Sequence, residues 1–241
     1  MALRELWLSR HGESVANIAA TSAERDGLEV IPIDIRDADV PLSSTGREQA
    51  DALAGWVAEH RSGLDVFWVS PYLRARETLA LALGETGPPA AVLIDERLRD
   101  RELGVLDLLT RRGVALRHPD EAERRRHLGK YYHRPPGGES WADVALRLRS
   151  FLRDAGEGPG ESAMIVAHDA VVLLLLSLLL ELGESELLEF AASHTVLNAS
   201  VTHVVRGHGR WELQEFSAVD HLQSEGAPVT VHPGSRDVEP R

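Results

Sequence analysis

The sequence predicts an α/β protein, a three-layer α/β/α domain built around a mainly parallel central sheet. Short apolar runs alternate with segments of helical periodicity, which is the pattern of βαβ units. The 241 residues are enough for one such domain with a sizeable core and a large insertion. Hydrophobic residues make up 43% of the chain and charged residues 27%, which is ordinary for a globular protein in water.

Six short segments are predicted strands. The first four are short apolar runs, which are strand candidates in the mainly parallel sheet. The last two flank the tripeptide Gly207-His208-Gly209 and form a predicted hairpin. The predicted strands are residues 6–8, 65–69, 91–94, 164–167, 201–205 and 211–216.

Four helices are predicted from their starting residues or their apolar pattern. Thr45 to Glu48 has the form of a capping box, and apolar residues follow it at helical spacing. Ser70 is a predicted N-cap with Pro71 at the first helical position, and Ser140 opens a third helix. Residues 170–180 are the most apolar run, which is too short to span a bilayer and is typical of a buried core helix.

Residues 1–221 are predicted to form a single domain whose regular pattern is interrupted by two long connections. Residues 22–41 have no clean period. Residues 105–138 form a predicted lid insertion, which is basic because 105–134 holds eight Lys and Arg against four Asp and Glu. Long connections in compact domains usually serve a function. Residues 222–241 are polar with several Gly and Pro, so we predict a flexible tail.

The composition excludes several classes of function. The net charge of −12 argues against nucleic acid or an anionic membrane as a partner. The absence of cysteine excludes a cysteine nucleophile and a thiolate metal site. The first residues lack a long apolar stretch, so no secretory signal is predicted and a cytoplasmic location is expected. Phosphate-loop, dinucleotide-binding and His-Glu-x-x-His motifs are missing, and we expect no metal and no cofactor.

Polar residues follow each of the first four predicted strands. Because the carboxyl ends of parallel strands meet at one edge of a sheet, we expect these residues to share one crevice. Taken singly, Arg74 is typical of a solvated helix surface, His168 of a structural histidine and residues 95–102 of a solvated charged face. In strand order the polar pairs are Arg10 and His11, Ser70 and Arg74, Asp100 and Glu102, and His168 and Asp169.

These residue types together can transfer a phosphoryl group. Arginine guanidiniums bind phosphate oxygens in bidentate fashion, and a neutral imidazole can attack phosphorus. A second, protonated histidine can neutralise charge on the transferring group. A carboxylic acid can protonate the leaving oxygen, and the resulting carboxylate can activate water. The arginines bring the positive charge that a magnesium ion supplies elsewhere, so the predicted reaction needs no metal.

Several segments resemble motifs of the histidine phosphatase superfamily, also called phosphoglycerate mutase-like. The similarity covers residues 5–205, and the segments follow one another in the family's order. They are LSRHGES at 8–14 with Asn17, PLSSTGREQA at 41–50, SPYLRARET at 70–78, LRD at 98–100 with Gly104, GES at 138–140, and IVAH at 165–168. The resemblance implies a phosphoglycerate mutase-like fold with a basic helical lid insertion.

The resemblance also implies roles for single residues. The histidine of the first motif is the phosphorylated nucleophile in the family, and the other polar residues of these motifs hold the phosphoryl group or the substrate. In this chain the implied nucleophile is His11, and the implied phosphoryl-binding residues are Arg10, Arg74 and His168. The expected substrate-binding residues are Ser14, Asn17, Glu102 and Asp169.

The proton donor has three candidates. The glutamate of the mutase-like branch falls on Asp100, which we prefer because the rest of the chain resembles that branch. Asp169 is the main rival, since the acid-phosphatase branch uses the aspartate of a His-Asp pair. Glu102 lies two residues from Asp100 and is the third candidate.

The favoured reaction is hydrolysis of a small-molecule phosphate monoester by water attacking the phosphohistidine. Phosphoglycerate mutases of the family have a tyrosine where this chain has Leu103, which favours a phosphatase over a mutase. A mutase-type phosphotransferase and a non-catalytic phosphate-ester binding module are the alternatives. The expected partner is a small phosphorylated substrate, and the oligomeric state is not predictable.

The basic lid carries a further hypothesis, that one or two of its cations face the site and attract an anionic substrate while Tyr131 and Tyr132 shape the pocket. The alternative is a solvated helical surface, which is the ordinary place for most of these arginines. The cations in question are Arg111, Arg112, Arg124, Arg125, Arg126, Lys130 and Arg134.

Overall fold

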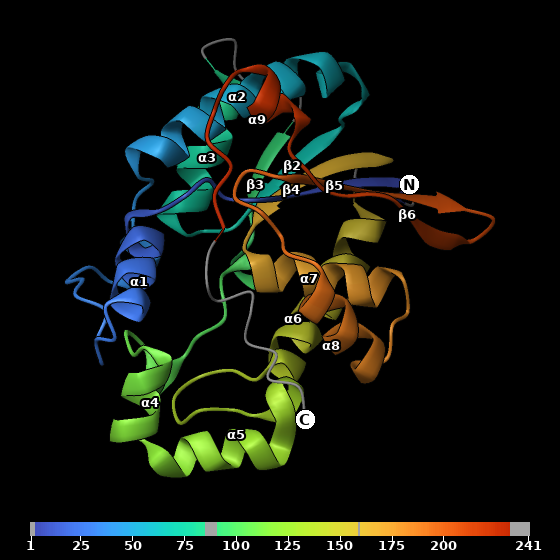
Figure 1. The fold of residues 1–241 in the computed structure, drawn as a ribbon. Helices are drawn as coiled ribbons and strands as arrows, with labels where there is room; N and C mark the ends of the chain where they lie inside the picture. Colours follow the sequence, from blue (N-terminus) through green and yellow to red (C-terminus); the bar gives the residue numbers. More distant parts are fainter. Residues whose placement is uncertain (1–2, 85–90, 159, 232–241) are drawn as a thin grey trace.

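The computed structural model describes residues 3–84, 91–158 and 160–231, and within them six strands form one mixed sheet. The strand order is β3-β2-β4-β1-β5-β6, with β1 to β4 parallel and β5 and β6 antiparallel to their neighbours (Figure 1). The predicted α/β class and mainly parallel sheet are confirmed. The strands are β1 Glu5–Arg10, β2 Val66–Val69, β3 Ala91–Ile94, β4 Ser162–Ala167, β5 Val201–Gly207 and β6 Arg210–Ala218.

Helices cover both faces of the sheet, which makes the three layers. α2, α3 and α9 lie on one face, and α6, α7 and α8 lie on the other (Figure 1). The α-helices are α1 Val15–Arg25, α2 Ser44–His60, α3 Leu73–Leu83, α4 Arg111–Arg117, α5 Pro119–Tyr132, α6 Trp141–Glu157, α7 Asp169–Leu179, α8 Glu184–Ser193 and α9 Asp220–Ser224. Short 3₁₀ turns are η1 Asp37–Asp39, η2 Arg61–Gly63, η3 Glu96–Leu98 and η4 Gly104–Leu106.

The central strand β4 shows why a strand inside the sheet is apolar throughout, whereas the residues of the edge strand β3 are exposed. Its successive side chains point to opposite faces of the sheet. Ala163 and Ile165 join the core with α6 and α7, whereas Met164 and Val166 pack with α2 and α3. The predicted core helix is α7, which is buried along nearly its whole length. Within the described residues, no helix combines the length and the apolarity needed to cross a membrane.

The helix after β2 begins later than predicted. Ser70 and Pro71 lie before the helix, and Tyr72 is the N-cap residue of α3. Ser70 does not cap because its hydroxyl oxygen lies 2.8 Å from Nε2 of His168 and also accepts from the backbone N of Tyr72 at 3.3 Å. The predicted N-cap serine is therefore a side chain of the polar cluster at the strand ends.

The start of α2 also differs from the prediction. The capping residue is Ser43, whose hydroxyl accepts from the backbone N of Gly46 at 2.9 Å. Thr45 lies inside the helix, so the predicted capping box at Thr45 to Glu48 is wrong by two residues. Ser43 is extended, with ψ of 174°, and this lets its side chain reach the first turn.

The irregular segment 22–41 is partly helical, because α1 extends to Arg25. Only two residues of α1, Ala20 and Ala23, are buried. A helix that buries so few side chains needs no regular apolar spacing, and its sequence therefore shows no clear helical period. Past α1 the segment runs through η1 to the start of α2.

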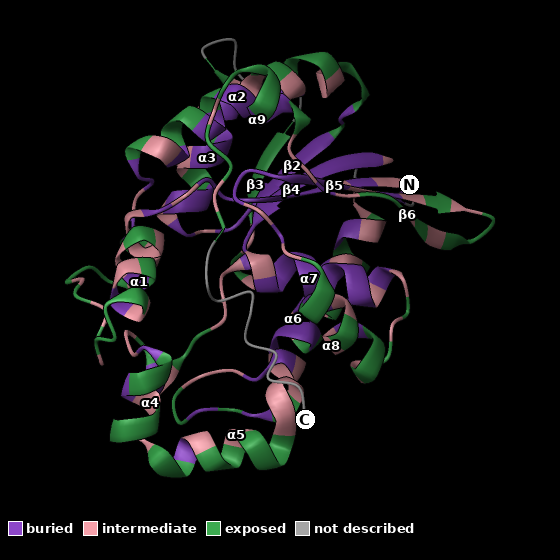
Figure 2. Cartoon of the chain, in the orientation of Figure 1, coloured by how far each residue is buried: buried purple, intermediate pink, exposed green. Residues whose placement is uncertain are grey.

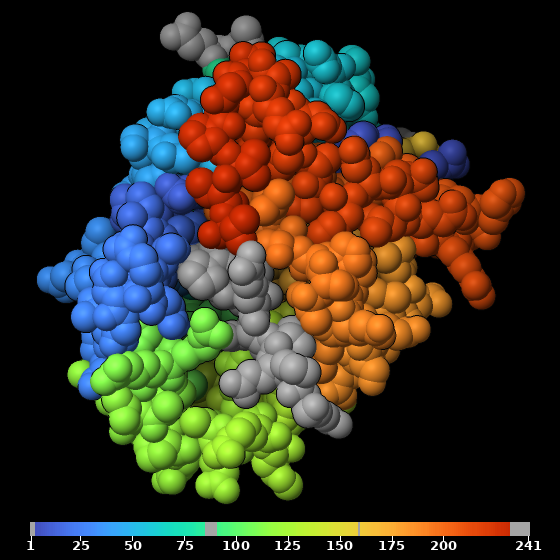
Figure 3. All heavy atoms as spheres, in the orientation of Figure 1, coloured from blue at the N-terminus to red at the C-terminus, as the bar shows by residue number. Residues whose placement is uncertain are grey.

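The predicted lid insertion at 105–138 contains η4 and the helices α4 and α5, which lie apart from the sheet layers (Figure 1). Most of the outer surface of α4 and α5 is exposed (Figure 2). The lid lies beside α1 (Figure 3), where the backbone N of Arg111 donates to Glu24 at 2.9 Å. His133, at the end of α5, lies 3.0 Å from the buried Glu121 carboxylate near its start.

The predicted tail at 222–241 begins inside α9. Leu222 is fully buried, and the Thr230 hydroxyl donates to Asn198 at 3.1 Å and accepts from the Gln49 amide at 2.9 Å. Residues 222–231 are therefore held against the domain by packing and hydrogen bonds. The rest of the predicted tail, 232–241, lies outside the described residues.

Candidate active site

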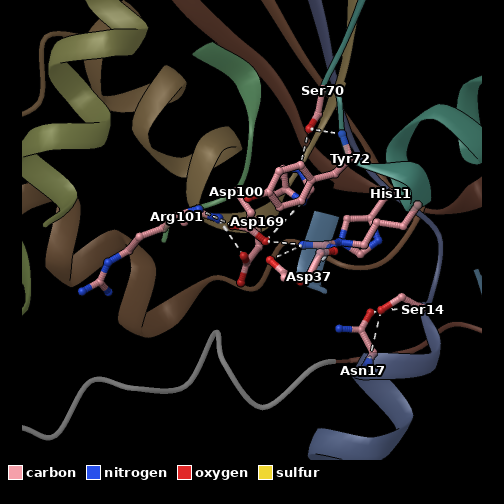
Figure 4. Close-up of polar contacts among 12 residues, drawn as sticks. His11, Ser14, Asn17, Asp37, Ser70, Tyr72, Asp100, Arg101 and Asp169 are labelled. Carbon is pink, nitrogen blue, oxygen red and sulfur yellow. Dashed lines mark hydrogen bonds and ion pairs between the residues drawn. The ribbon is translucent and has the colours of Figure 1, made fainter. Parts of the chain in front are cut away.

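The polar residues that follow the four parallel strands meet at the carboxyl edge of the sheet (Figure 4). β1 and β4 are adjacent, so Arg10 pairs in register with Ala167, and His11 and His168 follow directly. The two imidazole rings lie 5.2 Å apart between centroids, and both side chains are buried. His11 and His168 therefore lie together at the end of the sheet, as expected from the sequence.

His11 has its ring fixed by the backbone of the next residue. Its Nδ1 lies 2.6 Å from the carbonyl oxygen of Gly12, which can only accept, so Nδ1 carries the proton and Nε2 carries the lone pair. Burial, followed by the charges of Arg74, His168 and Arg10, holds the pKa of His11 well below its usual value of 6.5. The ring is therefore a neutral imidazole at pH 7, the form that can attack phosphorus.

The turn after His11 depends on close backbone approach. A Cβ atom on Gly12 would lie 2.5 Å from the carbonyl oxygen of Gly46, and one on Gly46 would lie 1.9 Å from that of Glu13. Glu13 also binds the cap of α2, since its carboxylate accepts from the Ser43 hydroxyl at 2.9 Å. Both glycines let the His11 segment rest directly on the start of α2.

Arg74, in the first turn of α3, forms hydrogen bonds with three other residues of the site. Its Nε donates to Nε2 of His11 at 3.3 Å, and its Nη2 donates to Asp100 at 3.0 Å. Its Nη1 donates to the backbone oxygen of Asp37 at 2.7 Å and to the Asp37 carboxylate at 2.9 Å, and Nη2 reaches the second carboxylate oxygen at 3.4 Å. A guanidinium has five N–H groups, so all of them are occupied. A phosphoryl group that binds Arg74 must displace one of these partners, and Asp37, which accepts three of the five hydrogen bonds, is its main competitor.

Asp100 and His168 form the other side of the cluster. Nδ1 of His168 lies 3.2 Å from the Asp100 carboxylate, and Nε2 lies 2.8 Å from the Ser70 hydroxyl. Burial raises the pKa of Asp100, but the charges of His168 and Arg74 and the backbone N–H of Arg101 outweigh it and hold the pKa well below the usual range. Burial lowers the pKa of His168, and the charge of Asp100 opposes that shift only in part.

Arg10 is fully enclosed, with 1% of its surface exposed. Its Nη1 donates to the carbonyl oxygen of Val196 at 2.7 Å, while its Nε has no hydrogen-bond partner among the described residues. Burial lowers the pKa of Arg10, and the charges of Asp169 and Asp100 oppose this shift. A buried guanidinium N–H without an acceptor is costly, and an anionic ligand at the cluster would satisfy it.

Ser14 and Asn17 lie one turn away from the cluster, at the start of α1. They form a reciprocal cap, in which Ser14 accepts from the backbone N of Asn17 at 3.2 Å and Asn17 accepts from that of Ser14 at 3.1 Å. Asn198 links them to the nucleophile, since its amide donates to Asn17 at 3.3 Å and to the backbone oxygen of His11 at 3.1 Å. In this structure Ser14 and Asn17 act as helix caps beside the site.

The two alternative acids are placed differently from Asp100. Asp169 is the first residue of α7, and its carboxylate accepts from the backbone N of Ala170 at 2.7 Å. Glu102 accepts from the phenol hydroxyl of Tyr72 at 2.7 Å. Both lie at the same edge of the sheet as Asp100, but Glu102 lines a separate cavity rather than contacting Arg74.

That cavity, about 520 Å³ in volume, lies next to the cluster and shares Asp37 and Tyr72 with it. Its three arginines, Arg36, Arg76 and Arg99, come from the η1 segment, α3 and the loop after η3. None of the lid cations named in the sequence-based hypothesis lines it. Several pair with acids of the lid or of the neighbouring helices α1 and α6 instead: Arg111 with Glu24, Arg124 with Glu121 and Arg134 with Asp143.

Sequence reasoning missed three residues of the site, namely Asp37, Tyr72 and Asn198. Asp37 lies in the irregular connection after α1, where no period or motif predicts its position. Tyr72 lies inside the SPYLRARET segment but has no role in the motif. Asn198 comes to His11 only because the chain before β5 returns to the end of β1. The described residues contain no group of three or more His, Asp or Glu side chains that could hold a metal ion.

The fold and the cluster are those of an enzyme that acts on a phosphoryl group. The chain belongs to the histidine phosphatase superfamily, branch 1, whose family model matches residues 6–219. The expected resemblance is confirmed, and the relatives include several phosphatases and a probable phosphoglycerate mutase.

Three relatives show the range of the similarity. The 6-phosphofructo-2-kinase/fructose-2,6-bisphosphatase of Gallus gallus is 31% identical over 195 residues, which are 80% of this chain and 37% of that protein. A mycobacterial glucosyl-3-phosphoglycerate phosphatase, solved with VO3, is 30% identical with a TM-score of 0.68, covering 90% of this chain and all of that one. The alpha-ribazole phosphatase of Shigella flexneri, 22% identical with a TM-score of 0.72 and coverage of 89% and 96%, shares the fold. The chain spans about a third of the length of the curated bifunctional relatives it matches.

Proposed function

We propose that the chain is a metal-independent phosphatase that hydrolyses a small-molecule phosphate monoester through a phosphohistidine on His11. The observation that carries the proposal is the state of His11, which is buried, neutral and oriented with the Nε2 lone pair toward Arg74. A neutral imidazole has the lone pair that nucleophilic attack requires, and the hydrogen bond from Arg74 to this lone pair must open as phosphorus approaches.

In the first step, Nε2 of His11 forms a bond to phosphorus while the bond from phosphorus to the ester oxygen breaks. Arg10, Arg74 and His168 bind the non-bridging oxygens, and the buried Nε of Arg10 gains an acceptor. Two arginines beside the nucleophile supply positive charge without a metal ion.

The departing oxygen takes its proton from an acid, for which we prefer Asp100. In the free enzyme the low pKa of Asp100 keeps it ionised. A dianionic phosphoryl group on Arg74 cancels the permanent positive charge beside Asp100, and so favours the protonated acid once substrate is bound. Asp169 and Glu102 are the alternative donors.

In the second step, the acid, now a carboxylate, takes a proton from water, and the oxygen of that water attacks phosphorus. The bond from phosphorus to Nε2 breaks, which returns neutral His11 and releases inorganic phosphate. The phosphatase names of the relatives support hydrolysis, and a mycobacterial relative has also been solved with inorganic phosphate.

The test is turnover of p-nitrophenyl phosphate in EDTA by wild type, His11→Ala and a control, His127→Ala, whose exposed imidazole lies on α5. We expect metal-free turnover that is lost only in His11→Ala, together with an acid-labile phosphoenzyme in wild type. Turnover that requires added metal, or equal turnover in His11→Ala, contradicts the proposal. Formation of 2-phosphoglycerate from 3-phosphoglycerate, in the presence of a trace of 2,3-bisphosphoglycerate, would instead favour the mutase alternative, and an absence of any turnover would favour the binding module.

A further inference from the structure

The cavity beside the cluster lies where the leaving group of a bound phosphate ester would lie. Asp37, which accepts hydrogen bonds from Arg74, lines the cavity. Tyr72 lines it too, and the centroid of its ring lies 5.3 Å from that of the His168 ring. Its volume of about 520 Å³ suits a small molecule rather than a polymer.

Most of the side chains that line this cavity are charged. The lining side chains without charge are Tyr72, Pro71 and Ala38, which offer an acyl chain or a nucleobase only a small apolar surface. Five carboxylates and three guanidiniums supply the rest of the lining. Such a wall suits a ligand that forms many hydrogen bonds.

Two of the three guanidiniums are already neutralised. Arg36 forms a bidentate pair with Asp39 at 2.8 Å for both bonds. Arg99 pairs with Glu139, which lies outside the cavity, at 2.8 Å. Arg76 is the remaining cation, and it is exposed on α3.

Asp37 pairs with Arg74 and Asp39 with Arg36, so Glu102 and Asp107 are lining carboxylates without an ion pair among the described residues. After burial, the charges of Asp37 and Glu102 raise the pKa of Asp107, and the charges of Glu102 and Asp37 likewise raise the pKa of Tyr72. Glu102 is held in place by the Tyr72 hydroxyl at 2.7 Å. The wall that faces a leaving group is thus acidic.

We propose that this cavity is the leaving-group subsite for a neutral, hydroxyl-rich group such as a polyol or sugar. Glu102 and Asp107 are specificity-determining residues that accept hydrogen bonds from its hydroxyls and repel an anionic leaving group. The inference rests on the proposed phosphatase function and adds the substrate class to it. Carboxylates accept several hydrogen bonds at once, and a second anion beside them meets like charges in a partly buried wall.

Glycerol 3-phosphate and 3-phosphoglycerate test this directly, because they differ by a neutral hydroxymethyl group against a carboxylate. We expect wild type to favour glycerol 3-phosphate in kcat/KM by at least about tenfold, since like-charge contacts cost several kcal/mol and 1.4 kcal/mol is tenfold. In Asp107→Asn, and separately in Glu102→Gln, the ratio of the two kcat/KM values should fall by about threefold or more. The control Asp51→Asn, an exposed carboxylate of α2 outside the cavity lining, should leave the ratio unchanged.

A preference of wild type for 3-phosphoglycerate overturns the inference, as does a ratio that neither variant shifts. Loss of 3-phosphoglycerate turnover in Arg76→Gln would also overturn it, because Arg76 would then be a receptor for an anionic leaving group. p-Nitrophenyl phosphate distinguishes failure of the proposed phosphatase function from failure of the proposed subsite. If wild type does not hydrolyse it, the phosphatase function is wrong. If wild type hydrolyses it but prefers 3-phosphoglycerate to glycerol 3-phosphate, only the subsite is wrong.

Discussion

The cluster at the carboxyl edge of the sheet and the lid above it are both rich in arginine, but their charges lie in opposite environments. The Arg74 side chain is 5% exposed and contacts His11, Asp37 and Asp100. In the lid, Arg124 is 54% exposed and Arg134 is 63% exposed, each paired with one nearby acid. Buried charges interact strongly because water does not screen them, whereas exposed pairs contribute about 0–1 kcal/mol. Whether an arginine is buried among charged partners therefore indicates a functional site better than the number of arginines in a segment does.

The largest effect should come from removing the nucleophile. His11→Ala deletes the only atom of the cluster that forms a bond to phosphorus in the proposed mechanism, so we expect kcat to fall on the order of 10⁴-fold or more. Steady-state assays with p-nitrophenyl phosphate and far-UV circular dichroism measure activity and folding together. A folded variant that keeps more than a tenth of the activity is incompatible with His11 as the nucleophile.

Asp100→Asn and Asp169→Asn should separate the two acids. Loss of general acid catalysis costs about 10²–10⁴-fold, and the loss should be larger for an alkyl phosphate than for p-nitrophenyl phosphate, whose leaving group needs little protonation. We expect this pattern for Asp100→Asn. If Asp169→Asn shows it and Asp100→Asn does not, Asp169 is the donor.

The buried histidines predict a loss of stability in mild acid. His11 and His168 have pKa values below 6.5 in the fold because burial disfavours their charged forms. Below pH 6.5 the unfolded chain binds more protons than the folded one, so the free energy of unfolding falls by up to about 1.4 kcal/mol per pH unit for each histidine. Urea unfolding at pH 7.5 and 5.5 measures this, and a shallower pH dependence in His11→Gln is expected. An unchanged free energy of unfolding between these values would contradict neutral buried rings.

Asp37→Asn should increase the affinity for phosphate esters. Asp37 occupies Arg74 in the free enzyme, and a tethered carboxylate competes with any anion for that guanidinium. We expect KM for p-nitrophenyl phosphate and the inhibition constant of inorganic phosphate each to fall by about three- to tenfold. Asp39→Asn is the matched control, since Asp39 pairs with Arg36 instead. A rise in KM would mean that Asp37 binds the substrate.

The smallest effect should come from the lid. Charge reversal at Arg124 removes the ion pair between this exposed guanidinium and the buried Glu121, outside the cavity lining, so we expect kcat/KM for glycerol 3-phosphate to change by less than about twofold. The comparison with Arg74→Gln, which should abolish phosphoryl binding, measures the difference between the two regions. A tenfold loss in Arg124→Glu would restore the hypothesis that lid cations guide the substrate.

Much of the fold was predictable because the signals are local. The continuous apolar residues of β4 and the long apolar run of α7 can only be buried, and the cap at Ser140 with Asp143 is confirmed. The errors lie where a side chain has two possible partners. Ser70 reads as an N-cap in sequence but contacts His168 in the fold, which moved the start of α3 to Leu73.

The sequence by itself determined the strands, the order of the motifs and the set of residues at the strand ends, because these follow from apolar pattern and chain order. Only the tertiary structure decided that Asp37 occupies Arg74, that Asn198 contacts the backbone of His11, and that the lid arginines lie away from the cavity. Each of these contacts joins segments far apart in the chain or depends on where a long polar side chain finds its nearest partner. Local periodicity encodes neither the contacts between distant segments nor the partner of a long polar side chain, because tertiary packing decides both.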